Sequence, residues 1–180
     1  MDEFNAEKVN NNQSAPGYSK DETTSTIKFV SKEDEKIMLH DISKATIAGM
    51  QSIDVVREYV ENMDFKNYID RLNQDYARIS ERCSKYMSAH GVASDFFGSV
   101  RQAFQRNAVK ISMLTSSSDS KIAEHMLKGT NMAIDVVSKN FNGSNATLSP
   151  DLIALAKDFQ QILENSLSEF RKYLMSRYTH

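Results

Sequence analysis

The sequence predicts an all-α fold: an antiparallel bundle of four helices, built as two helical hairpins, with an additional shorter helix. Two observations carry this prediction. Apolar residues after Ser31 recur at steps of three and four, which is the period of an amphipathic helix. Only 6 Gly and 2 Pro occur among 180 residues, too few to supply the turns of a many-stranded β-fold. Hydrophobic residues make up 40% of the chain and charged residues 26%, as in ordinary globular domains.

Residues 1–30 are predicted to be a disordered N-terminal tail, and residues 31–180 to form the bundle. The tail is rich in Asn, Ser, Thr and acidic residues, and its few apolar residues follow no period. It does not resemble a signal peptide, because it begins with acidic residues and has no apolar run of about 7–15 residues. The single cysteine, Cys83, cannot form an intrachain disulfide, which favours a cytoplasmic protein.

The first hairpin is predicted to begin with a long helix over Lys32–Asn62, capped by Ser31. A second helix follows almost at once, with Asp64 as its expected N-cap and Gly91 as its left-handed stop. A connection this short makes the two helices antiparallel. The predicted core residues are Met38, Ile42, Ala45, Gly49, Ile53, Val56, Val60 and Met63 in the first helix, and Phe65, Tyr68, Ile69, Leu72, Tyr76, Ile79, Cys83, Tyr86 and Met87 in the second.

The second half is predicted to begin with the shorter helix, over Ser94–Leu114, followed by a helix over Ser120–Asn140. Ser149, Pro150 and Asp151 form an N-cap, a first-turn proline and an early acid, so the last helix begins there. The predicted core residues are Phe97, Val100, Phe104, Ala108 and Ile111, then Ile122, Met126, Thr130, Ala133, Val137 and Phe141, then Leu152, Leu155, Phe159, Ile162, Leu163, Phe170 and Leu174.

Two glycines, Gly49 and Gly129, fall inside predicted helices, where each costs about 1 kcal/mol relative to alanine. A close approach of another helix would offset that cost. The alternative is a glycine that is merely tolerated.

The sequence lacks the ligand pattern of a di-metal bundle. Di-iron bundles take a Glu from each of two helices and a Glu-x-x-His from each of the other two. This chain contains no Glu-x-x-His and only 4 histidines. His40 lies off the core stripe, and Cys83 is expected to be a small buried hydrophobe. We therefore assign no catalytic, cofactor or metal residues and no small-molecule substrate.

Charge and hydropathy argue against two classes of partner. The 22 Lys and Arg are balanced by 24 Asp and Glu, whereas nucleic-acid binders concentrate positive charge. The longest purely apolar stretch, Leu152–Ala156, is far shorter than the roughly 18 residues of a spanning helix. We therefore expect neither nucleic-acid binding nor membrane insertion.

The order of these elements is accompanied by three local patterns: Ala48-Gly49-Met50, the stretch Gly98–Leu114, and Leu127-Lys128-Gly129-Thr130. Together they resemble a family of uncharacterised bacterial ferritin-like proteins, a domain of unknown function related to stress-induced ferritin-like proteins. The resemblance covers Glu33 to Tyr178. It implies that the predicted bundle is ferritin-like.

The resemblance also locates the metal ligands of the metal-binding relatives. Their six positions are occupied here by Met50, Thr130, Asp75, Arg78, Ile162 and Asn165. Of these only Asp75 is a strong ligand, and Arg78 would add a positive charge beside it. The resemblance therefore implies the fold without its metal chemistry. The residues expected to fill the interior are Met50, Tyr76, Met126 and Thr130.

The function expected from these observations is that of a non-catalytic ferritin-like bundle acting by self-association or protein binding. The expected contact residues are Phe96, Phe97, Val100 and Phe104. The alternative is a metal-dependent oxidase or iron-handling protein with a degenerate site around Asp75, Glu81 and Glu164. A third hypothesis is a chaperone-like or adaptor role that uses the acidic, Asn-rich tail as a flexible arm.

Overall fold

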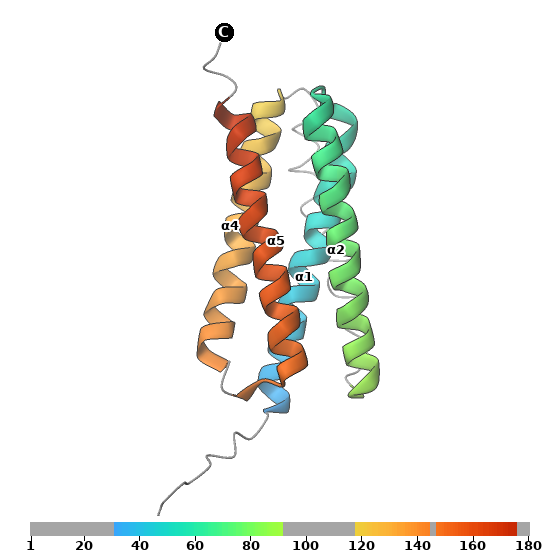
Figure 1. Cartoon of the computed structure of the whole chain (residues 1–180), viewed down its shortest axis with the longest axis vertical. Helices are drawn as coiled ribbons and strands as arrows, with labels where there is room; N and C mark the ends of the chain where they lie inside the picture. The colour runs from blue at the N-terminus through green and yellow to red at the C-terminus, as the bar shows by residue number, and fades with distance from the viewer. Residues whose placement is uncertain (1–30, 92–117, 145–146, 176–180) are drawn as a thin grey trace, which may run out of the picture.

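The structure is a computed structural model that describes residues 31–91, 118–144 and 147–175 (Figure 1). Its elements are α1 (Lys32–Val56), the 3-10 turn η1 (Arg57–Tyr59), α2 (Met63–Ala89), α4 (Asp119–Ser144) and α5 (Pro150–Met175). The described residues contain no strand, so the all-α prediction is confirmed. The predicted tail, the helix predicted over residues 94–114 and the four expected contact residues lie outside the described residues.

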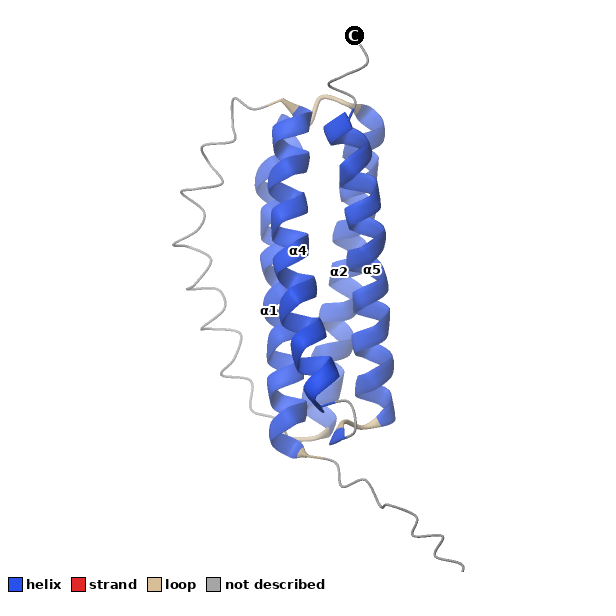
Figure 2. Ribbon diagram, turned by 90° about the vertical axis from the view of Figure 1, so that its left-hand side faces the viewer, coloured by secondary structure: helices blue, strands red, loops and turns tan. Residues whose placement is uncertain are grey.

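The four long helices lie side by side, with α1 and α5 running in one direction and α2 and α4 in the other (Figures 1 and 2). At one end, the backbone N–H of Ser31 before α1 donates to the carbonyl of Thr147 before α5 (2.7 Å). At the other end, the Asp119 carboxylate of α4 accepts from the backbone N–H groups of Glu61 (2.9 Å) and Asn62 (2.8 Å). The chain from the end of α2 to the start of α4 therefore has to link opposite ends of the bundle.

The first helix is shorter than predicted. It ends at Val56 rather than at Asn62, and the chain passes through η1 into an extended Val60. Asn62 caps α2 by accepting from the backbone N–H of Phe65 (2.9 Å), so the prediction of Asp64 as the cap is wrong. The cause is a contact between distant segments. The backbone N–H groups of Glu61 and Asn62 donate to the Asp119 carboxylate, so they do not need the carbonyl acceptors that a continuing α1 helix would supply.

The other predicted helix boundaries are close to those observed. Ser31 accepts from the backbone N–H of Asp34, and Ser149 from that of Leu152, both at 3.3 Å. Gly91 adopts a φ of 64°, the left-handed stop expected after α2. The fourth predicted segment is longer than expected at both ends, spanning Asp119–Ser144.

The core lies along the predicted stripes. Eight of the nine residues expected from α2 are buried, and Tyr68 is partly buried. Phe65 stacks on Tyr173 (ring centroids 4.3 Å apart) and meets Phe170 edge-on (6.2 Å), which joins α2 to α5. Met63 is the exception to the predicted stripe, with 65% of its surface exposed at the start of α2. None of the helices in the described ranges has the length and apolarity needed to cross a membrane.

Candidate functional site

Residues from all four long helices meet around Tyr76 in the bundle interior. Tyr76 of α2 is buried, and its phenol is hydrogen-bonded to Thr130 of α4 and Ser166 of α5. Its ring lies against Gly49 of α1, where a Cβ atom would be only 2.9 Å from Tyr76 Cδ2. The close helix approach expected at Gly49 is therefore confirmed. The same expectation is wrong for Gly129, because a Cβ atom added there would have no neighbour within 4 Å.

We call these four residues, Gly49, Tyr76, Thr130 and Ser166, the tyrosine cluster. The Thr130 hydroxyl donates to the carbonyl of Met126 (2.9 Å), and that of Ser166 to the carbonyl of Ile162 (2.7 Å). Since both hydroxyl protons are committed, the single phenol proton of Tyr76 is donated to one of these two oxygens at a time. Burial raises the pKa of Tyr76 well above its usual value, so the tyrosine cluster is neutral. Expected interior residues Tyr76, Thr130 and Met126 are buried, and Met50 is partly buried.

The ligand positions carried over to α2 do not face the interior. Tyr76 and Ile79 are buried, whereas Asp75 and Arg78 form an ion pair with each other outside the core. Asp75 and Arg78 therefore lie off the buried face of α2, since one step along a helix turns a side chain by about 100°. The residues that do point inward, a tyrosine and an isoleucine, are not the Glu and His of a di-iron bundle.

The two positions implied on α5 also miss its fully buried face. Ile162 is partly buried and Asn165 is exposed, while Leu163 and Ser166 are fully buried. Asn165 therefore lies off the buried face of α5, and Ile162 lies at its edge. On this helix too, the inward positions hold a leucine and a serine.

The three carboxylates of the alternative site have separate local partners. Asp75 is paired with Arg78, Glu81 bonds Lys85 (2.7 Å), and Glu164 accepts from Gln160 (2.9 Å). Across residues 31–91, 118–144 and 147–175, no three His, Cys, Asp or Glu side chains are grouped so as to hold a metal ion. The structure therefore does not bring together the degenerate site proposed around these carboxylates.

Cys83 and His40 lie where their positions in the sequence predict. Cys83 is fully buried, and burial raises the pKa of its thiol to about 11, so the thiol stays protonated. His40 is exposed and its ring contacts the carboxylate of Asp41 at 3.3 Å.

An apolar groove of about 440 Å³ runs between α1 and α4, and we call it the α1–α4 groove. On the α1 side the lining combines the small residues Ala45, Ala48, Gly49 and Ser52 with the charged residues Asp41 and Lys44. The α4 side carries Met132 and Val136, whose side chains remain 69% and 45% exposed. These two exposed apolar side chains lie one helical turn apart, beside the small residues of α1. Such a surface can pack against another apolar helix.

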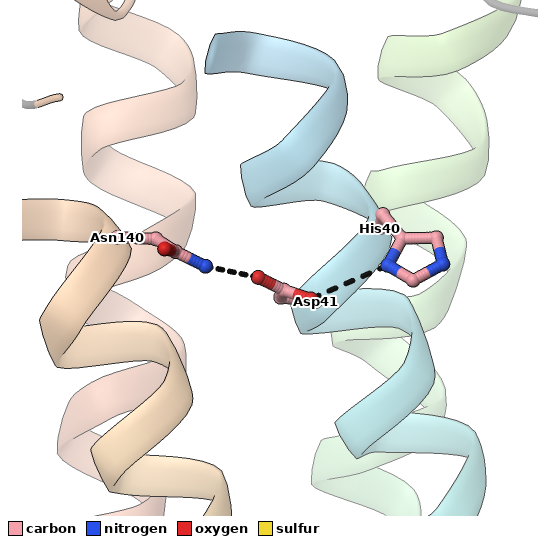
Figure 3. Close-up of polar contacts among 3 residues, drawn as sticks. All are labelled: His40, Asp41 and Asn140. Carbon is pink, nitrogen blue, oxygen red and sulfur yellow. Dashed lines mark hydrogen bonds and ion pairs between the residues drawn. The ribbon is translucent and has the colours of Figure 1, made fainter.

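Asp41 lines the groove at the end that lies toward the N-terminus of α1. Its carboxylate accepts from the side-chain amide of Asn140 on α4 and also contacts His40 (Figure 3). This bridge ties α1 to α4 where the apolar lining stops.

The opposite side of the bundle has a groove of different character. It measures about 560 Å³, lies between α2 and α5, and we call it the α2–α5 groove. The lining is mainly charged or polar: Arg71, Gln74, Asp75, Arg78, Asn165, Ser168 and Glu169, with Tyr68, Leu72 and Ile162. The α1–α4 groove, which has the larger share of apolar side chains, therefore suits an apolar partner better than the α2–α5 groove does.

A buried carboxylate at one end of the bundle was not predicted from the sequence. Glu35 is 6% exposed and accepts from the Tyr86 hydroxyl (2.6 Å) and the backbone N–H of Ser149 (3.1 Å). Burial disfavours its charge, but these hydrogen bonds outweigh that effect and lower the pKa of Glu35. The sequence places Glu35 in an acidic first turn. The tyrosine and serine that bury it come from distant segments, so only the fold brings them together.

Comparison with known proteins found no matching family model, curated protein or solved structure.

Proposed function

We propose that this protein is a non-catalytic ferritin-like helical bundle that acts by binding a helix, from a second copy or from a protein partner, through the α1–α4 groove. We further propose that it works in the cytoplasm, in keeping with a single cysteine that is a buried thiol. The observation that carries the proposal is the groove itself, with its small-residue surface and exposed Met132 and Val136.

The helix order supports the ferritin-like part of the proposal. Two antiparallel hairpins joined by one long connection between opposite bundle ends are the arrangement found in ferritin-like folds. Here α1 and α2 form one hairpin and α4 and α5 the other, and the link from Gly91 to Ser118 joins opposite ends.

The tyrosine cluster supports the proposal that the bundle is non-catalytic. Ferritin-like di-metal proteins direct carboxylates and imidazoles from all four helices into the interior. In this chain the four helices contribute a glycine, a phenol and two hydroxyls, all engaged in packing or hydrogen bonds. A neutral interior of this kind contributes rigidity to a scaffold.

The chemistry of the groove supports helix binding. An amphipathic helix laid into an apolar groove is a recurrent mode of protein recognition, read by side chains spaced at i, i+3, i+4 and i+7. Small groove residues let the incoming backbone approach closely, and exposed Met and Val side chains supply apolar area. The expected contact residues Phe97, Val100 and Phe104 have this spacing.

The test uses the full chain and the variants Phe97→Asp and Phe104→Asp. We expect each to lower the assembly mass in sedimentation equilibrium or to lower the melting temperature, because a carboxylate cannot enter an apolar contact without a large desolvation cost. Met63→Asp is the control, since this methionine is exposed at the start of α2, away from the groove. Unchanged mass and unchanged melting temperature in both Phe variants would overturn the proposal.

A further inference from the structure

We infer that the α1–α4 groove is occupied by residues 94–114 of the same chain, docked lengthwise as a helix with Phe97, Val100 and Phe104 facing the groove. The inference rests on the proposed helix-binding groove and names its occupant.

The length of chain outside the structure, and the places where it leaves and re-enters, favour this route. Residues 92–117 must pass from the end of α2 to the start of α4, at opposite ends of the bundle. The 26 residues of α4 span about 39 Å at about 1.5 Å per residue. A helix over 94–114 would span about 32 Å, and the residues that flank it would cover the rest.

The lining of the two grooves indicates which of them can receive residues 94–114. Since α2 and α4 lie diagonally across the bundle, with α1 and α5 each packed against both, the connection must cross over α1 or over α5. The route over α5 meets the α2–α5 groove, whose lining includes Arg71, Asp75 and Glu169. The route over α1 meets the α1–α4 groove, whose lining has more apolar side chains, among them Met126, Met132 and Val136, to receive the phenylalanines.

The register also fits. Along α1 the groove runs from Asp41 to Ser52, a rise of about 17 Å. The apolar stripe from Phe97 to Ala108 covers the same number of residues and the same rise. A segment that runs parallel to α1 then places Phe104 beside Ala48, where the small side chains leave room for a ring, and Phe97 beside Asp41, at the end of the apolar lining.

This docking has a consequence for binding. Three of the four expected contact residues would be used within the chain, and Phe96 would lie at the edge of the docked helix. A partner helix would then have to displace residues 94–114 or bind alongside them.

Disulfide trapping tests the inference on the full-length chain. Ala108→Cys is combined with Ser52→Cys or with Ala48→Cys, because a disulfide forms only when the two Cα atoms come within about 7 Å. The matched control combines Ala108→Cys with Gln74→Cys, which lies in the α2–α5 groove. The native Cys83 is fully buried and can stay in place.

The expected result is a monomer that migrates faster on a non-reducing gel for at least one α1 pair and not for the control pair. Disulfide-linked dimers from the α1 pairs would overturn the inference while leaving helix binding by a second copy in place. Equal trapping in all pairs, or none in any, would overturn the inference. In that case unchanged mass and melting temperature for Phe97→Asp and Phe104→Asp would also remove the proposed function.

Discussion

Tyr76 shows how one side chain can organise the interior of this bundle. Its ring is accommodated because position 49 of α1 has no Cβ, and its hydroxyl is satisfied by Thr130 and Ser166. The sequence indicates that Gly49 needs a close neighbour and that Tyr76 is buried. It does not pair the two, because which residues of α1 and α2 stand opposite each other is set by packing along their whole length.

The two helical glycines give a matched prediction. Gly49→Ala should destabilise the fold by about 1–3 kcal/mol, because the new Cβ would clash with the Tyr76 ring. Gly129→Ala should be neutral or stabilise it by up to about 1 kcal/mol, because alanine favours helix and the site is open. Urea unfolding measures both. Equal changes in unfolding free energy would contradict the packing described for Tyr76.

The buried carboxylate of Glu35 should make the free energy of unfolding depend on pH. Hydrogen bonds from Tyr86 and Ser149 lower its pKa below the ordinary value of 4.5, so its charged form stabilises the fold above that pH. This contribution is lost as the pH falls through the pKa of the folded state. Glu35→Gln should therefore cost about 1–3 kcal/mol at neutral pH, and the difference from the wild type should shrink as the pH falls below the ordinary carboxyl pKa of 4.5.

The control for this prediction is Glu33→Gln, a neighbouring carboxylate that is exposed at the surface. Its unfolding free energy should follow that of the wild type across the pH range. A cost for Glu35→Gln that is the same at every pH would show that the Glu35 charge is not what stabilises this end of the bundle.

At the scale of elements, short-range signals in the sequence predicted two helix starts and one helix stop well, but misplaced the end of α1 and the cap of α2. The Ser31 and Ser149 caps and the Gly91 stop depend on residues close in the chain, so the sequence contains the signal. The end of α1 depends on Asp119, which bonds the turn between α1 and α2 from more than fifty residues away. A local pattern cannot report such a contact.

The α1–α4 groove carries the prediction at this scale. If a helix covers the groove, Val136→Asp buries a charge against apolar side chains and should lower the unfolding free energy by about 1–3 kcal/mol. Met63→Asp should change it by no more than about 0.5 kcal/mol, since its side chain lies in solvent. The measurement is the thermal and urea unfolding of the full chain. A Val136→Asp protein as stable as the Met63→Asp control would mean that the groove is open to solvent.

At the scale of the whole molecule, the sequence predicts four long helices and two hairpins but not the facing of every helix. Asp75, Arg78 and Asn165, three of the positions that the resemblance implies, lie off the buried faces of α2 and α5. Their inward neighbours, Tyr76 with Ile79 and Leu163 with Ser166, have no counterpart in a Glu-x-x-His pattern. The expected contact residues lie outside the described residues and stay a prediction.

We propose that this bundle is ferritin-like and has a packed interior and a binding surface in place of a metal site. The most direct test is the metal content per chain, measured by elemental mass spectrometry on untagged protein from cells supplied with iron and manganese. We predict only background, substoichiometric metal. About two metal ions per chain, the content of a di-metal bundle, would contradict the claim.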